Sequence, residues 1–324
     1  MSRSTTWPNA LREALQQACR APSYHNSQPW RWVLGDDTLE LHLDPRRLVA
    51  SDTSGRQALL SCGAVLDHFR VASAAAGWTI EVDRYPNPND HKHLATIAFT
   101  HMAYITEGHR RRAEAMRHRR TDRLPFAAPT DWESLEPLLR RAVGESALVD
   151  VLGADAYPTL CKAAELSESE RLYDSPYHAD LHWWTSVSDP TAGIPHSSLV
   201  TAAESDRVGI GRQFPVTHHR EQRATVPQDE ARVIVLSTID DTSLDVLGCG
   251  EALSAALLSA TMSGLASCTL SHLTEVPSSC AVVRELTGRG VPQLLVRIGA
   301  TPSDEPISPP TPRRPLTDVL TIRR

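Results

Sequence analysis

Hydrophobic positions along the 324-residue chain switch between helical and strand-like spacing, which predicts a mixed α+β fold. Apolar residues at steps of four predict a short helix over 9–20. Residues 30–44 are expected to form a hairpin, because two alternating segments flank the turn residues Gly35-Asp36-Asp37. Further helices are expected over 56–76, 132–143, 158–173, 245–263 and 278–286, and further strands over 78–85, 94–101, 232–238 and 293–299.

Two segments lack clear periodicity. Residues 175–227 are rich in Pro, Gly, His and Ser, and loops of that length are usually functional lids or disordered. The tail from Thr301 to Pro315 is Pro-rich and is expected to be extended.

A short internal match raises the possibility of a duplicated chain. The segment that begins at Cys62-Gly63 aligns without gaps to the one that begins at Cys249-Gly250, and both end in Gly followed by an apolar residue. Because apolar helices resemble one another, chance accounts for such a match about as well as duplication does.

Composition excludes several classes of protein. The net charge is −6, which gives no support for nucleic-acid binding. The polar N-terminus has no signal-peptide pattern, and no apolar run reaches membrane-spanning length. The six cysteines are scattered without a CxxC pair, so a reduced, cytoplasmic protein without a membrane partner is expected. Only Lys92 and Lys162 are lysines, so anion contacts must come mostly from guanidinium groups.

The strongest local motif is the segment Ala21-Pro22-Ser23-Tyr24-His25-Asn26-Ser27-Gln28-Pro29-Trp30. It puts hydroxyl, amide and backbone N–H groups into one turn, a set that suits a planar heterocycle with carbonyl and imide edges. An ordinary Asn/Ser turn followed by Pro would carry the same residues.

This segment resembles the flavin loop of the nitroreductase family, Pro-Ser-Ser-x-Asn-x-Gln-Pro-Trp, and departs from it only at Tyr24. A backbone contact at that position would survive the change, whereas a hydroxyl contact would not. The resemblance implies a nitroreductase-like α+β fold and one bound flavin mononucleotide (FMN).

A second family element is a basic motif that grips the FMN phosphate, here Arg119-Arg120-Thr121-Asp122-Arg123. It ends the most basic stretch of the chain, which holds seven arginines between 110 and 123. Two guanidinium forks beside a hydroxyl can surround a dianionic phosphate. An Arg-rich run without further context is more often a solvated face.

The order of these two motifs is the reverse of the family's order. Family members are homodimers in which one subunit supplies the arginines and the other supplies the loop. The resemblance therefore implies an intramolecular pseudo-dimer, with one related half over 1–108 and a second over 109–324 that carries a lid-like insertion at about 171–227. It further implies one complete FMN site in a monomer, with the mirror-related site empty.

Two more matches lie in the second half. Gly264-Leu265-Ala266-Ser267-Cys268-Thr269-Leu270-Ser271 resembles the family segment whose backbone approaches the flavin ring, although a helix cap leading into a core segment is equally consistent. Arg313-Arg314-Pro315 resembles the C-terminal basic element that returns to the phosphate, and a disordered charged tail is the alternative. The residues that the resemblance implies at the flavin are Pro22, Ser23, Tyr24, Asn26, Gln28, Arg119, Arg120, Thr121, Arg123, Leu265, Ala266, Thr269, Leu270, Ser271, Arg313 and Arg314.

Other chemistries have weaker support. His178 and His182 are four residues apart but lack the Glu of an HExxH motif, and no metal site is expected. No P-loop, nucleophile elbow or Rossmann fingerprint occurs.

Within the family the chain is most similar to the mycobacterial Acg-type NAD(P)H nitroreductases. That resemblance implies hydride transfer from NAD(P)H to FMN and on to a small-molecule acceptor, with no side chain acting as catalytic acid or base, and a role in hypoxia or dormancy. The alternative is a protein that holds FMN without turnover, because Tyr173, Tyr177, Trp183 and Trp184 in the long segment could cover the ring. A mobile loop, or one packed over the degenerate site, is the plainer interpretation of that segment.

Overall fold

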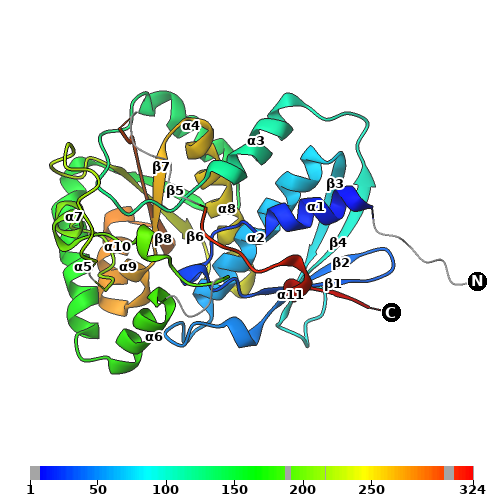
Figure 1. Ribbon diagram of the computed structural model, residues 1–324, viewed down its shortest axis with the longest axis horizontal. Helices are drawn as coiled ribbons and strands as arrows, with labels where there is room; N and C mark the ends of the chain where they lie inside the picture. The colour runs from blue at the N-terminus through cyan, green and yellow to red at the C-terminus, as the bar shows by residue number, and fades with distance from the viewer. Residues whose placement is uncertain (1–7, 187–190, 216, 303–309, 324) are drawn as a thin grey trace, which may run out of the picture.

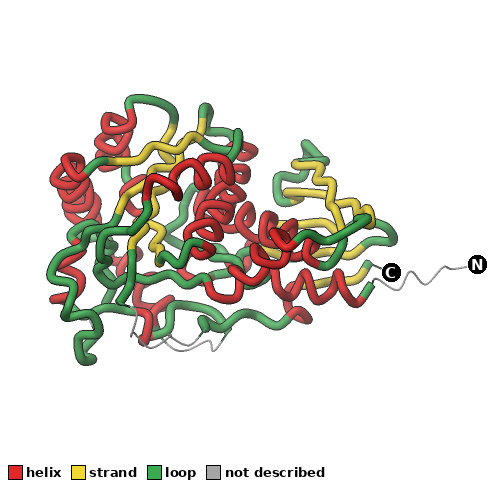
Figure 2. The backbone as a smooth tube through the Cα atoms, turned by 90° about the horizontal axis from the view of Figure 1, so that it is seen from above, coloured by secondary structure: helices red, strands yellow, loops and turns green. Residues whose placement is uncertain are grey.

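The computed structural model describes residues 8–186, 191–215, 217–302 and 310–323. Most of the polar N-terminal segment and the middle of the Pro-rich tail lie outside the described residues, as do four residues of the predicted lid and its residue 216. The described chain is built from two sheets with two long helices between them, as the view from above shows (Figure 2).

The first sheet lies at the right of Figure 1 and has the strand order β3-β4-β2-β1-β9. Apart from β9, it comes from one continuous segment of chain. That segment runs through α1 (Asn9–Ala18), β1 (Trp30–Leu34), β2 (Leu39–Leu43), η2 (Pro45–Arg47), α2 (Arg56–Ala75), β3 (Trp78–Arg84), β4 (His93–His101) and α3 (Glu107–His118).

The second sheet has the order β5-β6-β8-β7. Its elements are α4 (Trp132–Val143), β5 (Leu148–Leu152), β6 (Arg232–Thr238), α8 (Ser243–Met262), β7 (Ala266–Leu270), α9 (His272–Glu275), α10 (Pro277–Thr287) and β8 (Val291–Gly299). Read from its other edge, this order is β7-β8-β6-β5, which matches β3-β4-β2-β1 element for element. Without the helices that lie between paired strands of the second half, both halves run helix, strand, strand, helix, strand, strand.

The second half differs by α9 and α10 between β7 and β8, and by a long segment between β5 and β6. It contains η3 (Ala154–Ala156), α5 (Tyr157–Arg171), α6 (Ser175–Thr185), η4 (His196–Ser198) and α7 (Ala202–Val208). The extra segment thus begins after Leu152 and ends before Arg232, some twenty residues earlier than the predicted start of the lid at 171.

Helices α2 and α8 pack directly against each other in the middle of the molecule. They meet at Gly63 and Gly250: a Cβ built on Gly63 would lie 2.8 Å from the Cα of Gly250, and one on Gly250 would lie 2.9 Å from the Cα of Gly63. The same Cβ atoms would clash with the carbonyl oxygens of Leu247 and Leu60, respectively. The contact is therefore reciprocal, because each contacting residue of α2 has a contacting counterpart 187 positions later in α8.

Each half also sends an arm to the other. The C-terminal segment crosses from the second half to the first (Figure 1), forms α11 (Leu316–Val319) and adds β9 (Leu320–Ile322) parallel to β1. In the opposite direction, the chain after α3 reaches the second half, where Thr121 bridges Ser267 and Ala127 bridges Ala300.

Most predicted elements are confirmed to within a few residues, including the hairpin at 30–44 and the helix over 56–76. Strands β5, β7 and β9 were missed, and the segment 264–271, which resembles the family's ring-approaching segment, contains all of β7. The segment 175–227 is not an unstructured loop, since it carries α6 and α7. Helix α8 is long and apolar enough to cross a membrane, but it is mostly buried within the protein, as a core helix is.

Candidate functional site

The Pro-Ser segment forms a tight loop between α1 and β1. Three of its residues have left-handed backbone angles (His25 φ 50°, Asn26 φ 57°, Gln28 φ 52°), a conformation that needs support from surrounding contacts. Ser23 supplies one such contact, since its Oγ accepts a hydrogen bond from the Gln28 N–H at 3.1 Å. Ser61 on α2 supplies another, accepting from the Tyr24 N–H at 3.0 Å. The loop is therefore held rigidly against the central helix.

The amide side chains of the loop anchor other segments. Gln28 is fully buried; its Nε2 donates to the carbonyl of Thr191 at 2.8 Å, and its Oε1 accepts from the Arg314 N–H at 2.9 Å. Asn26 donates to the carbonyls of Gly193 and Pro312. The loop thus ties the inserted segment and the C-terminal arm to the first half.

A cavity lies beside this loop, between the two halves of the chain. Its walls come from the Pro-Ser loop, α2, the 121–123 segment, β7 with the following turn, and the inserted segment. The residues lining it are Pro22, Ser23, Tyr24, His25, Gln57, Leu60, Ser61, Thr121, Arg123, Val200, Ser205, Val208, Gly211, Arg212, Phe214, Leu253, Cys268, Thr269, Leu270, Ser271, His272, Leu294 and Arg297. We call this space the ring cavity.

A smaller pocket shares Pro22, Ser23, His25, Thr121 and Arg123 with the ring cavity. It is also lined by Asn26, Arg119, Gly193, Ile194, Pro195, Ser198, Thr311 and Arg313. Its described lining holds three arginines and no Asp or Glu. We call it the arginine pocket.

The guanidinium groups of the arginine pocket are partly unsatisfied. Arg119 is only 6% exposed, and its Nε has no partner among the described residues. Burial, with Arg120 and Arg20 nearby, lowers the pKa of Arg119 to about 10. Arg313 donates to the carbonyls of Arg20 and Ala21, and burial together with Arg119 lowers its pKa to about 9. Such a cluster is destabilised by desolvation and mutual repulsion, and a bound anion would relieve both.

A buried carboxylate, Glu275 of α9, holds the inserted segment over the ring cavity. Glu275 forms ion pairs with Arg212 and, at 2.9 Å, with Arg171, and it accepts hydrogen bonds from Ser271 at 2.7 Å and Tyr24 at 3.3 Å. Burial opposes ionisation of Glu275, but the two guanidinium groups outweigh it and hold its pKa at about 2. This Glu275 hub joins the Pro-Ser loop, the inserted segment and the β7–α9 turn.

Most of the predicted site residues gather around these two spaces. Those that line one or both are Pro22, Ser23, Tyr24, Asn26, Arg119, Thr121, Arg123, Thr269, Leu270, Ser271 and Arg313.

Five predicted residues do not line either space. Leu265 is buried in the core beneath the second sheet, and Ala266 begins β7. The Arg120 guanidinium donates to the carbonyls of Arg117 and Arg119 instead. Gln28 and Arg314 bond to each other and act behind the cavity wall. Position in the sequence alone could not show which motif residues line the cavity and which support it from behind.

The aromatic lid was placed wrongly by sequence. Tyr173 and Trp183 are largely exposed, and Trp184 lies under Arg47 with its Nε1 bonded to Asp180. Tyr177 is buried but does not line the cavity; its hydroxyl accepts a hydrogen bond from Arg212, which does. The inserted segment instead covers the ring cavity with Val200, Ser205, Val208, Gly211, Arg212 and Phe214.

Several lining residues escaped sequence analysis. His25 and His272 line the ring cavity, and both ring nitrogens of each have no partner among the described residues. His25 lies at a variable position of the Pro-Ser loop pattern, and His272 directly follows the segment 264–271. Neither histidine therefore matches a position that the family patterns specify. Ser61 and Arg212 reach the site only through tertiary packing.

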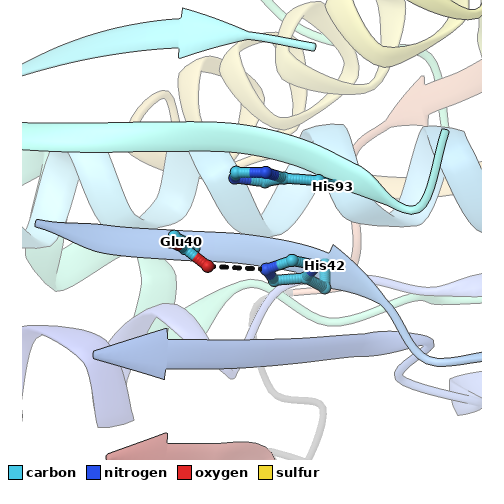
Figure 3. Close-up of side chains that lie close together, drawn as sticks. All are labelled: Glu40, His42 and His93. Atoms are coloured by element: carbon cyan, nitrogen blue, oxygen red, sulfur yellow. Dashed lines mark hydrogen bonds and ion pairs between the residues drawn. The ribbon is translucent and has the colours of Figure 1, made fainter. Parts of the chain in front are cut away.

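One group of metal-ligating side chains occurs among the described residues, on the first sheet rather than at the cavity. Figure 3 shows Glu40 and His42 on β2 beside His93 on β4. Glu40 already accepts from both terminal nitrogens of Arg323, at 3.0 and 2.9 Å, and pairs with His42 at 2.9 Å. A cation would have to displace this guanidinium, so we interpret the group as a polar network that fixes the C-terminal strand.

Comparison with known proteins identifies the family. A protein of Mycobacterium tuberculosis strain H37Rv that carries the provisional name NAD(P)H nitroreductase acg is 54% identical over 318 residues, which cover 97% of this chain and 96% of that protein. The chain belongs to the Acg-type nitroreductase family. An uncharacterized protein of the same strain is 48% identical over 321 residues, covering 97% of this chain and 93% of that protein. No family model matches the chain.

Solved nitroreductases are more distantly similar. The FMN and NADPH-dependent nitroreductase NfnB from sphigopyxis sp. strain HMH is 17% identical, with a TM-score of 0.42, and the match covers 66% of this chain and 99% of that one. The FMN-dependent NfnB of Mycobacterium smegmatis, in complex with NADPH, is 15% identical with a TM-score of 0.41 and covers 67% of this chain and 100% of that one.

Proposed function

We propose that this protein binds one FMN per chain and transfers hydride from NAD(P)H through it to a small-molecule acceptor. The observation that carries the proposal is a pair of adjoining spaces that share five lining residues. In the ring cavity, Arg212 and Arg297 are already paired with Glu275 and Asp229. In the arginine pocket, Arg119 and Arg313 each have an Nε atom without a partner among the described residues. That division matches a ligand with a planar ring at one end and a phosphate at the other.

The residues present fit FMN at its phosphate end. The Arg119 guanidinium is buried with an orphaned Nε, and Arg313 has an orphaned Nε beside it. A phosphate would supply the missing acceptors and the missing negative charge, and each charge-assisted hydrogen bond contributes about 1.5–3 kcal/mol. Thr121 and Arg123 lie at the junction of the two spaces, where they would hold the linker between ring and phosphate.

Bound FMN would supply the two-electron chemistry, passing a hydride equivalent from NAD(P)H to the acceptor. The chain's own part is to bind, orient and shield the ring. Leu60, Leu253 and Leu294 supply apolar walls, and Phe214 with Val200 excludes water from the side of the inserted segment. No lining side chain needs to move a proton for this role.

We further infer that the chain is a monomer that reproduces a two-subunit arrangement. Support comes from the matching strand orders and from the reciprocal contacts of α2 and α8. The related position in the second half lacks such a loop. In the first half the Pro-Ser loop is held by the hydrogen bond from the Tyr24 N–H to Ser61. The counterpart of Ser61 is Gly248, which lies near the Ser146 carbonyl in a four-residue turn between α4 and β5. One flavin site per chain follows. A cytoplasmic location is part of the same proposal.

A second function, storage of FMN without turnover, has its own supporting observation. The Glu275 hub holds the inserted segment across the ring cavity, which Phe214 and Arg212 of that segment line. A segment held in that position would keep a nicotinamide from the flavin ring. The two functions differ in whether NADPH can reach the ring.

The test combines binding and reduction. FMN affinity would be measured by quenching of flavin fluorescence for the parent, for Arg119→Ala with Arg313→Ala, and for Arg110→Ala. Arg110 is an exposed arginine of α3 paired with Glu107, so it controls for the loss of charge. We expect the double variant to lose at least a hundredfold in affinity and the control to lose less than threefold; equal affinities would refute the phosphate placement.

Anaerobic addition of NADPH to the FMN-loaded parent then separates the two functions. Rapid bleaching of the flavin absorbance supports the oxidoreductase. Bound flavin that stays oxidised supports storage.

A further inference from the structure

Two histidines in the wall of the ring cavity have hydrogen-bonding groups that no described residue uses. His25 is 6% exposed and His272 is 1% exposed. Both ring nitrogens of each lack a partner among the described residues. A buried polar group left without a partner costs about 1–3 kcal/mol, so four such atoms at one cavity point to a ligand that satisfies them.

Three other buried polar side chains of the same wall have hydrogen-bond or ion-pair partners within the protein. Ser61 donates to the carbonyl of Gln57 and accepts from the Tyr24 N–H. Arg297 pairs with Asp229, and Ser271 donates to Glu275. Among the described residues that line the ring cavity, the two histidines alone have buried polar atoms without a partner.

Contacts with neighbouring residues fix the ring of His25 and the backbone of His272. His25 stacks on Tyr24 with a centroid separation of 4.0 Å and an interplanar angle of 19°, and Phe214 meets it edge-on at 6.0 Å. His272 opens α9 at the end of β7, and the Ser167 hydroxyl donates to its backbone carbonyl at 3.0 Å. The imidazoles are thus presented to the cavity by fixed backbone and not by mobile side chains.

Both imidazoles are neutral at physiological pH. Burial, with Arg212 nearby, lowers the pKa of His272 to about 3, and the same two causes lower the pKa of His25 well below its usual value. A neutral imidazole offers one N–H donor and one acceptor nitrogen. The pair therefore requires a ligand whose ring carries both acceptors and donors.

We propose that His25 and His272 recognise the ring of the bound flavin by hydrogen bonds from neutral imidazoles, selecting a planar heterocycle with carbonyl and N–H groups on its edge. This inference rests on the proposed function. It goes beyond it, because neither histidine belongs to the loop pattern or the basic motif, and because it assigns recognition of the ring separately from recognition of the phosphate.

The experiment separates ring from phosphate by using riboflavin, which lacks the phosphate, beside FMN. His25→Phe and His272→Phe keep a flat ring and remove the hydrogen bonds, and His272→Asn returns a donor and an acceptor. We expect each Phe variant to bind riboflavin and FMN about tenfold more weakly, the loss of about one hydrogen bond, and His272→Asn to recover part of that loss.

A purely structural role predicts a different result. Because the Phe substitutions remove orphaned buried polar atoms, the ligand-free variants should melt at the same temperature as the parent or higher. Unchanged riboflavin affinity in the Phe variants would overturn the inference, whatever their melting temperatures.

The same measurements keep the two proposals apart. Arg119→Ala should weaken FMN binding and leave riboflavin binding as it is, whereas the histidine variants should weaken both. If the parent binds neither flavin, the proposed function fails. If the parent binds both and the histidine variants match it, only the histidine assignment fails.

Discussion

Gly63 and Gly250 touch at the crossing of α2 and α8, each occupying the space that a side chain on the other would need. The two residues lie 187 positions apart, and the same interval relates other contacts between the halves. Ser254, for example, donates a hydrogen bond at 2.6 Å to Asp67, its counterpart in α2. Because these two residues are each other's counterparts, their hydrogen bond lies where a two-fold axis between the halves would pass.

The glycine crossing gives a stability prediction. Gly63→Ala or Gly250→Ala would push a methyl group into the backbone of the facing helix, so we expect a loss of about 3 kcal/mol in the free energy of unfolding. Denaturant unfolding measures it. Gly248→Ala is the matched control on α8, because its Cβ would meet only the Ser146 carbonyl, at 3.8 Å, and should be neutral or stabilising by up to about 1 kcal/mol. Equal effects at 248 and 250 would contradict close helix packing.

One of the contacts that hold the C-terminal arm is made by the buried amide of Gln28. Gln28→Ala would leave the Arg314 N–H and the Thr191 carbonyl without their present partner, so we expect about 2 kcal/mol of destabilisation. FMN affinity should fall as well, because Arg313 precedes the released residue. Gln17→Ala, which removes one bond to the Ala113 carbonyl, should cost less and leave FMN binding intact. Thermal melts and fluorescence titration distinguish these outcomes.

The sequence predicted the secondary structure better than the arrangement of the site. The helices over 56–76 and 245–263 were found because long apolar runs have few alternatives. Strand β7 was missed because its five residues, Ala266–Leu270, are mostly small and include the polar Ser267 and Thr269. Its strand geometry depends on pairing with β8, which no local pattern records.

The site shows the same limit. The Pro-Ser loop and the basic motif lie about a hundred residues apart in sequence, and a resemblance to a family was needed to join them. Which motif residues line the cavity depended on packing: Arg119 lines it while Arg120 turns back to the backbone. His272, Arg212 and Phe214 come from segments with no pattern to mark them, since only the fold brings them to the cavity.

The mirror relationship between Ser61 and Gly248 gives a prediction about flavin stoichiometry. FMN titration should saturate at one per chain in a monomer, measured by absorbance and light scattering. Ser61→Gly removes the acceptor of the Tyr24 N–H and should weaken FMN binding about fivefold, the loss of about one hydrogen bond. Gly248→Ser should leave affinity and stoichiometry unchanged, and a second bound FMN in any variant would contradict the single-site proposal.

The Glu275 hub predicts how stability depends on pH. Its pKa is about 2 in the folded chain, because Arg212 and Arg171 outweigh the effect of burial, and it returns to about 4.5 on unfolding. A depressed carboxyl pKa stabilises the fold above the unfolded value, so this contribution should be lost as pH falls from about 4.5 towards 2. His25 and His272 act at higher pH: since they resist protonation only when folded, stability should begin to fall below about pH 6.5.

Glu275→Gln separates these two windows. It leaves the Arg212 and Arg171 charges buried without their carboxylate, so we expect a loss of about 3 kcal/mol at pH 7. The variant should keep the decline below pH 6.5 and lose the steeper decline below 4.5, whereas His272→Phe should reduce only the first. Unfolding free energies at intervals from pH 8 to 3 measure both slopes. Parallel curves for the parent and Glu275→Gln would mean that the carboxylate does not carry the charge that joins the inserted segment to the Pro-Ser loop.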